Sequence, residues 1–227
     1  MTDLSDLRHD NDGQPLTIEN TLESPWDQLR LWVQEAKTKN YFQPNAMSLA
    51  TVSSDGKPSC RIVLLKSFSP DGIIFYTHYL SRKGQEILNN PNAALLLYWD
   101  TLERQVRIEG KITKTTADIS DQYFQSRPRN SQIGAAISPQ SQVISSRDYL
   151  EKSYLNLNTL AQNQAIPRPE DWGGYCLTPT YFEFWQGRAS RLHDRVVYQK
   201  DLSQVNSNKV NSNKVHLNNW EKLLLAP

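Results

Sequence analysis

Two arginines and a histidine alternate near the C-terminal end of the chain. Arg191, His193 and Arg195 stand at every second position. If the segment is extended, all three side chains lie on one face, because strand side chains alternate sides. Two guanidinium groups and an imidazole repel each other and lose hydration there unless an anion lies opposite. The pattern, with three aromatic residues just before it, predicts a site for a phosphate or an electron-rich ring. A solvated basic edge strand is the alternative.

Arg61 and Lys66 enclose the apolar stretch 62–65. In a regular strand, residues five apart point to opposite faces, so the two cations would serve anions on different faces. A β-bulge would instead bring them to one face. A buried strand whose charged ends reach solvent explains the pair without any ligand.

A helix is expected to begin at Ser81, with Arg82 and Lys83 in its first turn. Cations are unfavourable at the positive end of a helix dipole unless they face an anion. The free backbone amides and the two cations together predict a phosphate seat. An ordinary surface helix is the alternative.

Tyr123 and Arg127 are four residues apart and share one face of an expected helix, and Ser131 is expected to cap the next helix. A phenol, a guanidinium and a hydroxyl suit a phosphate monoester. A tyrosine–arginine stack that closes the helix explains the same residues without a ligand.

Composition excludes several other classes. The chain has 227 residues, 25 of them basic and 24 acidic, and this net charge of +1 argues against nucleic acid and anionic membrane as partners. Cys60 and Cys176 lack metal-ligand spacing, so no metal site is predicted, and both are expected to pack as small apolar residues in a reducing compartment. The sequence has no apolar run of the roughly 20 residues that span a bilayer, no signal-peptide pattern and no P-loop. We therefore expect a cytoplasmic protein.

Turn and helix signals divide the chain into elements. We expect a mobile arm over residues 1–23 and one domain over residues 24–227. The domain is expected to begin with a helix capped by Ser24. A tandem repeat over 205–215 predicts a flexible insert at about 203–216, before the last strand. Further helices are expected at 81–89, 115–127, 131–137 and 147–163, and strands at 46–53, 59–68, 73–78, 93–99, 103–113, 175–186 and 192–199. This order predicts an α+β fold whose antiparallel strands most simply close into a barrel.

These segments, in this order, resemble the pyridoxamine 5′-phosphate oxidase family from about residue 20 to Pro227. The resemblance implies a mainly antiparallel α+β fold, an FMN-binding split β-barrel with peripheral helices, which binds FMN at a homodimer interface. The matching motifs are Arg61-Ile-Val-Leu-Leu-Lys66, Phe75-Tyr-Thr77, Ser81-Arg-Lys83, Thr101-Leu-Glu-Arg-Gln-Val106, Tyr123-Phe-Gln-Ser-Arg-Pro-Arg129, Ser131-Gln-Ile-Gly-Ala135, Glu183-Phe-Trp-Gln-Gly187 and Arg191-Leu-His-Asp-Arg195.

The resemblance also implies which residues contact each ligand. FMN contacts are expected from Arg61, Ile62, Val63, Leu64, Leu65, Lys66, Tyr76, Thr77, Arg82, Lys83, Gln105, Gln140, Ser141, Trp185 and Arg195. Substrate contacts are expected from Lys66, Tyr123, Arg127, Ser131, Arg191 and His193, the last two as catalytic residues.

The implied reaction is the oxidation of pyridoxamine 5′-phosphate and pyridoxine 5′-phosphate to pyridoxal 5′-phosphate, with O₂ as electron acceptor and H₂O₂ as by-product. Arg191 is expected to orient the substrate ring, since a guanidinium stays protonated. His193 is expected to be the proton acceptor. A non-catalytic split-barrel flavoprotein or a pyridoxal-phosphate carrier is the alternative, because a fold does not fix a function.

Three features depart from the family pattern. Arg8 matches the family's N-terminal arginine, but Asn11 stands where the family carries a tyrosine that covers the substrate. Leu224 replaces the arginine of the closing Arg-Leu-Ala-Pro motif, and the repeat over 205–215 is an insertion. A lid role for residues 8–11 is therefore left open.

Overall fold

The computed structural model describes residues 2, 4, 7, 10–162, 164–200 and 220–227. Arg8 and the predicted insert at 203–216 lie outside these residues. The chain forms two compact units. Unit 1 comprises Met1–Ser48, Ala94–Gly110 and Pro179–Pro227, and unit 2 comprises Leu49–Ala93 and Lys111–Thr178. A single domain over residues 24–227 stays a prediction.

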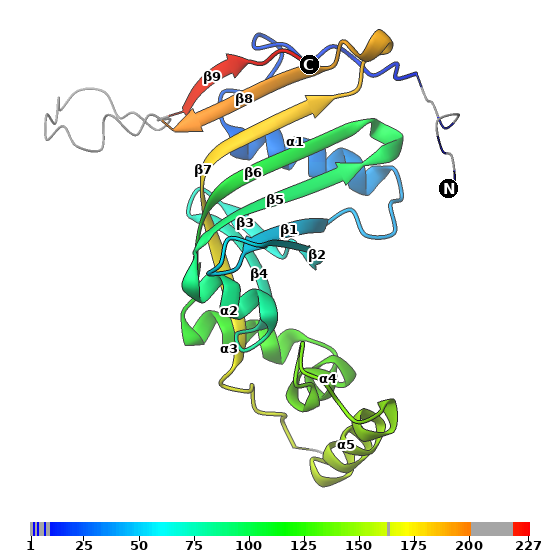
Figure 1. The fold of residues 1–227 in the computed structure, drawn as a ribbon, viewed down its shortest axis with the longest axis vertical. Helices are drawn as coiled ribbons and strands as arrows, with labels where there is room; N and C mark the ends of the chain where they lie inside the picture. Colours follow the sequence, from blue (N-terminus) through cyan, green and yellow to red (C-terminus); the bar gives the residue numbers. More distant parts are fainter. Residues whose placement is uncertain (1, 3, 5–6, 8–9, 163, 201–219) are drawn as a thin grey trace, which may run out of the picture. The chain divides into compact units, whose positions relative to one another are not determined.

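Helices and strands follow the predicted order (Figure 1). The strands hydrogen-bond in the order β2-β1-β5-β6-β7-β4-β3, with β8 paired to β7 and β9 to β8. The helices are α1 Pro25–Thr38, α2 Arg82–Asn89, α3 Ala117–Ser126, α4 Arg129–Ile137 and α5 Arg147–Leu160. The strands are β1 Ala46–Val52, β2 Pro58–Leu64, β3 Ser67–Ser69, β4 Gly72–His78, β5 Asn92–Trp99, β6 Arg104–Lys114, β7 Trp172–Gln186, β8 Asp194–Lys200 and β9 Trp220–Leu224. The prediction of an α+β fold is confirmed.

In unit 1, α1 packs two aromatic side chains against the second half of β7. Trp26 meets Phe182 edge to face with ring centroids 5.0 Å apart, and Trp32 meets Phe184 at 5.2 Å. Edge-to-face contacts of this kind stabilise a core beyond the area that they bury. Ser24 holds the N-cap position as predicted, but its side chain makes no capping hydrogen bond. The helix is therefore held by this packing rather than by its cap.

Antiparallel pairing continues from β7 through β8 to β9 in unit 1. The register pairs Trp185 with Arg195 and Val196 with Leu224. The N-terminal segment is anchored at two points in unit 1. The backbone N–H of Asp12 donates to Glu103 Oε2 at 3.0 Å, just before β6, and the backbone N–H of Leu16 donates to Asp194 Oδ2 on β8 at 3.0 Å. Mobility of residues 1–23 stays a prediction, and the structure adds that Asn11 directly precedes an anchored backbone.

In unit 2, the strand predicted over 59–68 is interrupted. It ends at Leu64 and resumes at Ser67, and Leu65 turns into the core at 5% exposure. The backbone N–H of Lys66 donates to the carbonyl of Ile74 at 2.9 Å, so the break stays attached to β4. β4 in turn pairs antiparallel with the first half of β7. The break changes the direction of Lys66, which matters for the site.

Helix α2 begins where Ser81 predicts. The Ser81 hydroxyl accepts from the backbone N–H of Gly84, as an N-cap residue does. Gly84 itself lies against Tyr79, where an added Cβ would come within 2.1 Å of the Tyr79 carbonyl oxygen. Only glycine fits at this position, so the first turn of α2 sits tightly on the end of β4.

The two cysteines differ in burial. Cys60 is exposed on β2, so its predicted packing as a small apolar residue is wrong, whereas Cys176 is partly buried.

Among the described residues, no cluster of His, Cys, Asp and Glu could hold a metal ion. Within that same part of the chain, no helix has the length and apolar character needed to cross a membrane.

Candidate functional site

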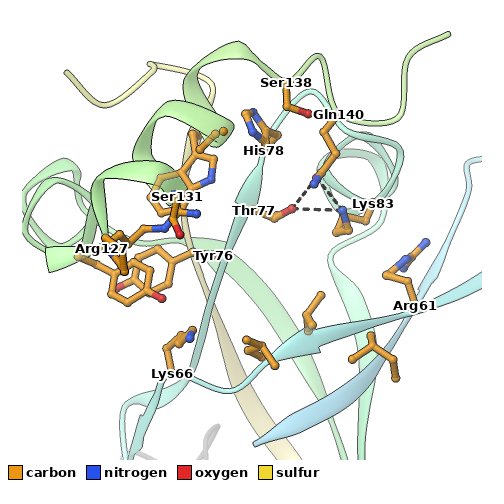
Figure 2. Close-up of a pocket in the computed structure, with 18 residues that line it drawn as sticks. Arg61, Lys66, Tyr76, Thr77, His78, Lys83, Arg127, Ser131, Ser138 and Gln140 are labelled. Carbon is orange, nitrogen blue, oxygen red and sulfur yellow. Dashed lines mark hydrogen bonds between the residues drawn. The ribbon is translucent and has the colours of Figure 1, made fainter. Parts of the chain in front are cut away.

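Unit 2 contains a cavity of about 680 Å³ (Figure 2). Four cationic side chains line it, and no carboxylate does among the described residues. A lining with an excess of cationic over anionic side chains is the environment that a phosphorylated ligand requires. The lining residues are Arg61, Ile62, Val63, Leu64, Lys66, Tyr76, Thr77, His78, Lys83, Tyr123, Arg127, Pro128, Ser131, Gly134, Ala135, Ser138, Gln140 and Trp172.

Arg61 and Lys66 both reach this cavity. The alternation of β2 directs Arg61 inward, while Ile62 is 62% exposed. Because the strand breaks at Leu65, Lys66 is released from the alternation that would have sent it to the opposite face. Lys66 lies with its Nζ atom 5.8 Å from the Tyr123 ring centroid. The break therefore brings Arg61 and Lys66 to the same cavity, which the sequence analysis expected only if the strand contained a β-bulge.

Lys83 lies at the centre of one end of the cavity. Its Nζ donates to Gln140 Oε1 at 2.9 Å and to Thr77 Oγ1 at 3.2 Å, and the Thr77 hydroxyl also donates to Gln140 (Figure 2). These partners are neutral, so none of them balances the ammonium charge. Burial lowers the pKa of Lys83 to about 8, and the nearby Arg61 guanidinium acts in the same direction.

Aromatic rings form the opposite end of the cavity. The Tyr76 ring stacks on Tyr123 with centroids 3.8 Å apart and on Trp172 at 5.6 Å. The Arg127 guanidinium lies 4.7 Å from the Trp172 centroid. Its buried Nη1 atom has no hydrogen-bond partner within the described part of the chain, and burial lowers the pKa of the group. A buried guanidinium nitrogen without a partner has donors available for a ligand oxygen.

Ser131 lines the cavity from inside α4. It was expected to cap this helix, and that prediction is wrong, because α4 begins at Arg129 and Pro128 holds the N-cap position. The backbone N–H of Ser131 donates to the Pro128 carbonyl at 2.8 Å. Its hydroxyl is thus carried by a helical turn, next to Arg127.

His78 is a cavity residue that the sequence did not single out. Its side chain is 6% exposed, and Nδ1 lies 3.7 Å from Asp171 Oδ2. Burial lowers the pKa of the ring, and the Asp171 carboxylate opposes this shift. Its position two residues after Tyr76, on the same face of one strand, is the signal that could have identified it. The other lining residues that were not expected to contact a ligand are Pro128, Gly134, Ala135, Ser138 and Trp172.

Several residues expected to contact FMN do not line this cavity. Leu65 is buried, and Arg82 is largely exposed, with 64% of its side chain accessible. Ser141 follows Gln140 with a positive φ of 72°. The remaining three, Gln105, Trp185 and Arg195, belong to unit 1.

Arg191 and His193 lie together in a second cavity, of about 450 Å³, in unit 1. The prediction that they share a strand face with Arg195 is wrong. Residues 189–191 form a 3₁₀ turn in which Ser190 and Arg191 adopt positive φ angles of 55° and 60°, and β8 begins only at Asp194. A left-handed turn breaks the two-residue alternation. The lining residues are Leu7, Asp10, Asn11, Arg188, Ser190, Arg191 and His193.

The hydrogen bond that His193 accepts determines which nitrogen of its ring carries the proton. The backbone N–H of Arg188 donates to Nδ1 at 3.1 Å, and the Trp185 ring lies 4.7 Å away. A neutral imidazole that accepts at Nδ1 carries its proton on Nε2. The geometry therefore favours a hydrogen-bond donor at Nε2 over the expected proton acceptor.

Arg195 is held by a buried carboxylate. Its Nε atom donates to Glu183 Oε1 at 2.8 Å, and Arg107 Nη2 donates to Glu183 Oε2 at 2.6 Å. Glu183 is only 2% exposed, and these two guanidinium groups outweigh its burial and keep its pKa below the usual value. Arg195 is thus a fixed, paired cation on β8.

Sequence profiles of one family cover most of the chain. The profile described as pyridoxamine 5′-phosphate oxidase matches residues 33–160, and the profile described as pyridoxine 5′-phosphate oxidase C-terminal dimerisation region matches residues 172–227.

Curated relatives carry the corresponding name. A pyridoxine/pyridoxamine 5′-phosphate oxidase of Acaryochloris marina is 52% identical over 88% of this chain and 91% of the relative. One of Leptospira interrogans is 45% identical over 99% of this chain and 98% of the relative.

Solved structures show the same fold. PhzG from Burkholderia lata, in complex with tetrahydrophenazine-1-carboxylic acid, matches with a TM-score of 0.82 and 29% identity over 96% of this chain and 100% of that chain. A pyridoxamine 5′-phosphate oxidase-related, FMN-binding protein from Nostoc punctiforme matches in fold, with a TM-score of 0.66 and 17% identity over 90% and 98%. The profiles, the relatives and the fold agree, and the chain belongs to the pyridoxamine 5′-phosphate oxidase family.

Proposed function

We propose that this protein binds FMN and oxidises pyridoxamine 5′-phosphate and pyridoxine 5′-phosphate to pyridoxal 5′-phosphate. The names of relatives that align over nearly the whole chain support this activity. The observation that carries the proposal is the unit 2 cavity, whose lining has four cations and, among the described residues, no carboxylate. Both ligands in the proposed reaction are phosphate monoesters, and such a cavity suits them.

The residues present fit two phosphorylated ligands at two ends of the cavity. Lys83, with Thr77 and Arg61, offers donors for the phosphate of FMN, and its existing partners are neutral. Arg127, with its partnerless buried nitrogen, offers donors for the substrate phosphate. Lys66, Tyr123 and Ser131 line the cavity with it.

When bound, FMN would supply the two-electron oxidation, with O₂ as the final acceptor and H₂O₂ as the by-product. The protein's own task is to hold the substrate in a reactive orientation. Arg191 would orient the substrate ring as a permanent cation. His193 would donate from Nε2 to a polar substituent of that ring, because its Nδ1 is occupied by the Arg188 backbone N–H.

The protein would act as a homodimer, with FMN at the interface. The match of residues 172–227 to a C-terminal dimerisation region supports this arrangement. Gln105, Trp185 and Arg195 would complete the flavin contacts, although they do not line the unit 2 cavity. Arg195 is preset for such a contact by its ion pair with Glu183.

Anaerobic reduction of the bound flavin tests the proposal directly. The purified protein should be yellow, elute as a dimer and bleach when pyridoxine 5′-phosphate is added without oxygen. Bleaching separates an oxidase from a flavoprotein or carrier that binds the same ligands without turnover. A yellow protein whose spectrum does not change with either substrate would overturn the proposed activity while keeping the flavin site.

A further inference from the structure

A buried carboxylate lies behind the Lys83 end of the unit 2 cavity. Glu86 is 5% exposed and does not line the cavity itself. Its Oε2 atom accepts from Thr51 Oγ1, from Ser59 Oγ at 2.6 Å and from Arg61 Nη2 at 3.1 Å. Its Oε1 atom accepts from Arg82 Nε at 2.9 Å. Both carboxylate oxygens therefore accept hydrogen bonds, and two of the four donors are guanidinium groups.

Three elements converge to build this contact, and β1 supplies Thr51. Ser59 and Arg61 are two residues apart and share the inward face of β2. Arg82 and Glu86 are one turn apart on α2, where an (i, i+4) pair can meet. Burial alone would raise the pKa of Glu86, but the four hydrogen bonds outweigh it and lower the pKa to about 2. The carboxylate is thus ionised at every pH at which the protein would work.

We propose that Glu86 is a positioning residue for the flavin phosphate, which holds Arg61 and Arg82 in place and balances the cations at that end of the cavity. This inference rests on the proposed function, because it presumes that FMN binds there. It assigns a role to a residue outside the set that the family resemblance implies.

The charge of Glu86 also acts on Lys83. The charged groups that act on the pKa of Lys83 are Arg61 on β2 and Glu86 on its own helix. Lys83 in turn lowers the pKa of His78, which faces it from the end of β4. Arg61 lowers the pKa of Lys83 and Glu86 raises it, against a burial effect that already brings it to about 8. Without the carboxylate, Lys83 would lose its proton at a lower pH. A phosphate dianion prefers the protonated amine, so flavin affinity would then fall at a lower pH.

A carboxylate near a phosphate also repels it, and the sign of the net effect depends on which influence is larger. The Glu86 charge is directly bonded to two arginines, which screen it from the cavity. Its loss would free Arg82, whose side chain is 64% exposed, to turn into solvent, and would cost Lys83 part of its charge. We therefore expect removal of the carboxylate to weaken phosphate binding.

The test compares FMN with riboflavin, which lacks the phosphate, in the Glu86→Gln variant. Dissociation constants are measured by flavin fluorescence on the full-length protein freed of flavin, from pH 6 to pH 9.5. At pH 8 the constant for FMN should rise about tenfold, the effect of one charge-assisted contact. The constant for riboflavin should stay within about twofold. The pH above which FMN binding weakens should move down by roughly one unit.

Two further variants sharpen the result. Glu151→Gln removes the carboxylate of the Arg147–Glu151 pair on α5, which has the same (i, i+4) spacing and the same 2.9 Å distance but is exposed. It should leave both constants and the pH profile unchanged. Glu86→Asp keeps the charge and shortens the side chain, so it should restore the pH profile while FMN still binds more weakly.

The outcomes separate this inference from the proposed function. If Glu86→Gln weakens FMN and riboflavin equally, or leaves the pH profile in place, Glu86 is a structural residue only and the inference fails. If that variant does not fold, Glu86→Asp decides: weaker FMN binding with the parental pH profile supports the inference, and unchanged FMN affinity overturns it. If the parent itself binds FMN no better than riboflavin, the proposed flavin site fails first.

Discussion

The two cavities obtain their cations from different kinds of backbone. In unit 2, Lys83 comes from the first turn of a helix and Arg127 from the residue that ends another. In unit 1, Arg191 comes from a turn with left-handed residues, between the strands β7 and β8. Regular elements place a side chain by their period, whereas a left-handed turn places it by local dihedral angles.

The balance of charge also differs between these regions. The unit 2 cavity has no carboxylate among its described lining residues, although the buried Glu86 pairs with Arg61 from behind the lining at 3.1 Å. In unit 1 two arginines are paired with carboxylates: Arg188 Nε lies 3.3 Å from Asp194, and Arg195 Nε lies 2.8 Å from Glu183. We infer that unit 2 supplies phosphate affinity and unit 1 supplies orientation. The predictions below test this division.

Arg191→Met should have the largest effect. If Arg191 orients the substrate mainly in the transition state, its loss should lower kcat/KM for pyridoxine 5′-phosphate by about a hundredfold, or about 3 kcal/mol. Flavin content should not change. Steady-state kinetics and the visible spectrum measure both. Arg188→Met, in the same cavity but paired with Asp194, is the matched control and should change kcat/KM far less. Equal effects of the two variants would contradict an orienting role for Arg191.

Arg127→Ala should act on substrate binding and leave the flavin in place. Losing one charge-assisted phosphate contact should raise KM about ten- to a hundredfold. Arg129→Ala is a suitable control, because Arg129 donates to the Gln164 and Ala161 carbonyls and does not line the cavity. Release of flavin by Arg127→Ala would show that the two phosphate seats have been assigned in the wrong order.

The sequence predicted the unit 2 cavity better than the unit 1 cavity, because more of the unit 2 side chains are positioned by patterns within a few neighbouring residues. The helix start at Ser81 is a pattern that spans one helical turn, and the structure keeps it. Helix α3 ends at Ser126, so Arg127 is its C-cap residue with extended backbone, but Tyr123 and Arg127 still line the same cavity. The break at Leu65 depends on burial of that side chain in a tertiary core, so strand propensity alone could not locate it.

The alternation of Arg191, His193 and Arg195 failed for a different reason. Two-residue spacing predicts a shared face only if the backbone is extended, and Ser190 and Arg191 are not residues that signal positive φ. For His78 the only sequence signal is its position two residues after Tyr76 in an expected strand, and this spacing does not indicate burial. Its significance comes from burial beside Asp171, which only the fold creates.

Lys83→Ala should weaken FMN binding about tenfold at pH 7. It should also remove the dependence of FMN affinity on pH. The pKa of Lys83 is lowered to about 8, so the ammonium is present below that pH and is lost as the pH rises through it. FMN affinity of the parent should therefore fall above pH 8. In the variant the FMN dissociation constant should be nearly flat between pH 7 and pH 9. A fall of the same size in both proteins would mean that another group titrates.

His193→Asn and His193→Gln should have the smallest effects, and their order tests the role of the ring. The asparagine amide can still accept from the Arg188 backbone N–H, as Nδ1 does at 3.1 Å, but it cannot reach the position of Nε2. The longer glutamine amide can place a donor near Nε2. If His193 donates to the substrate, the glutamine variant should keep more of the parental kcat/KM, and the asparagine variant should lose roughly three- to tenfold, the value of one neutral hydrogen bond. If His193 instead accepts a proton, neither amide can replace it, and both variants should lose activity equally. Flavin reduction measured without oxygen separates these cases, because it reports the step at the substrate and excludes reoxidation.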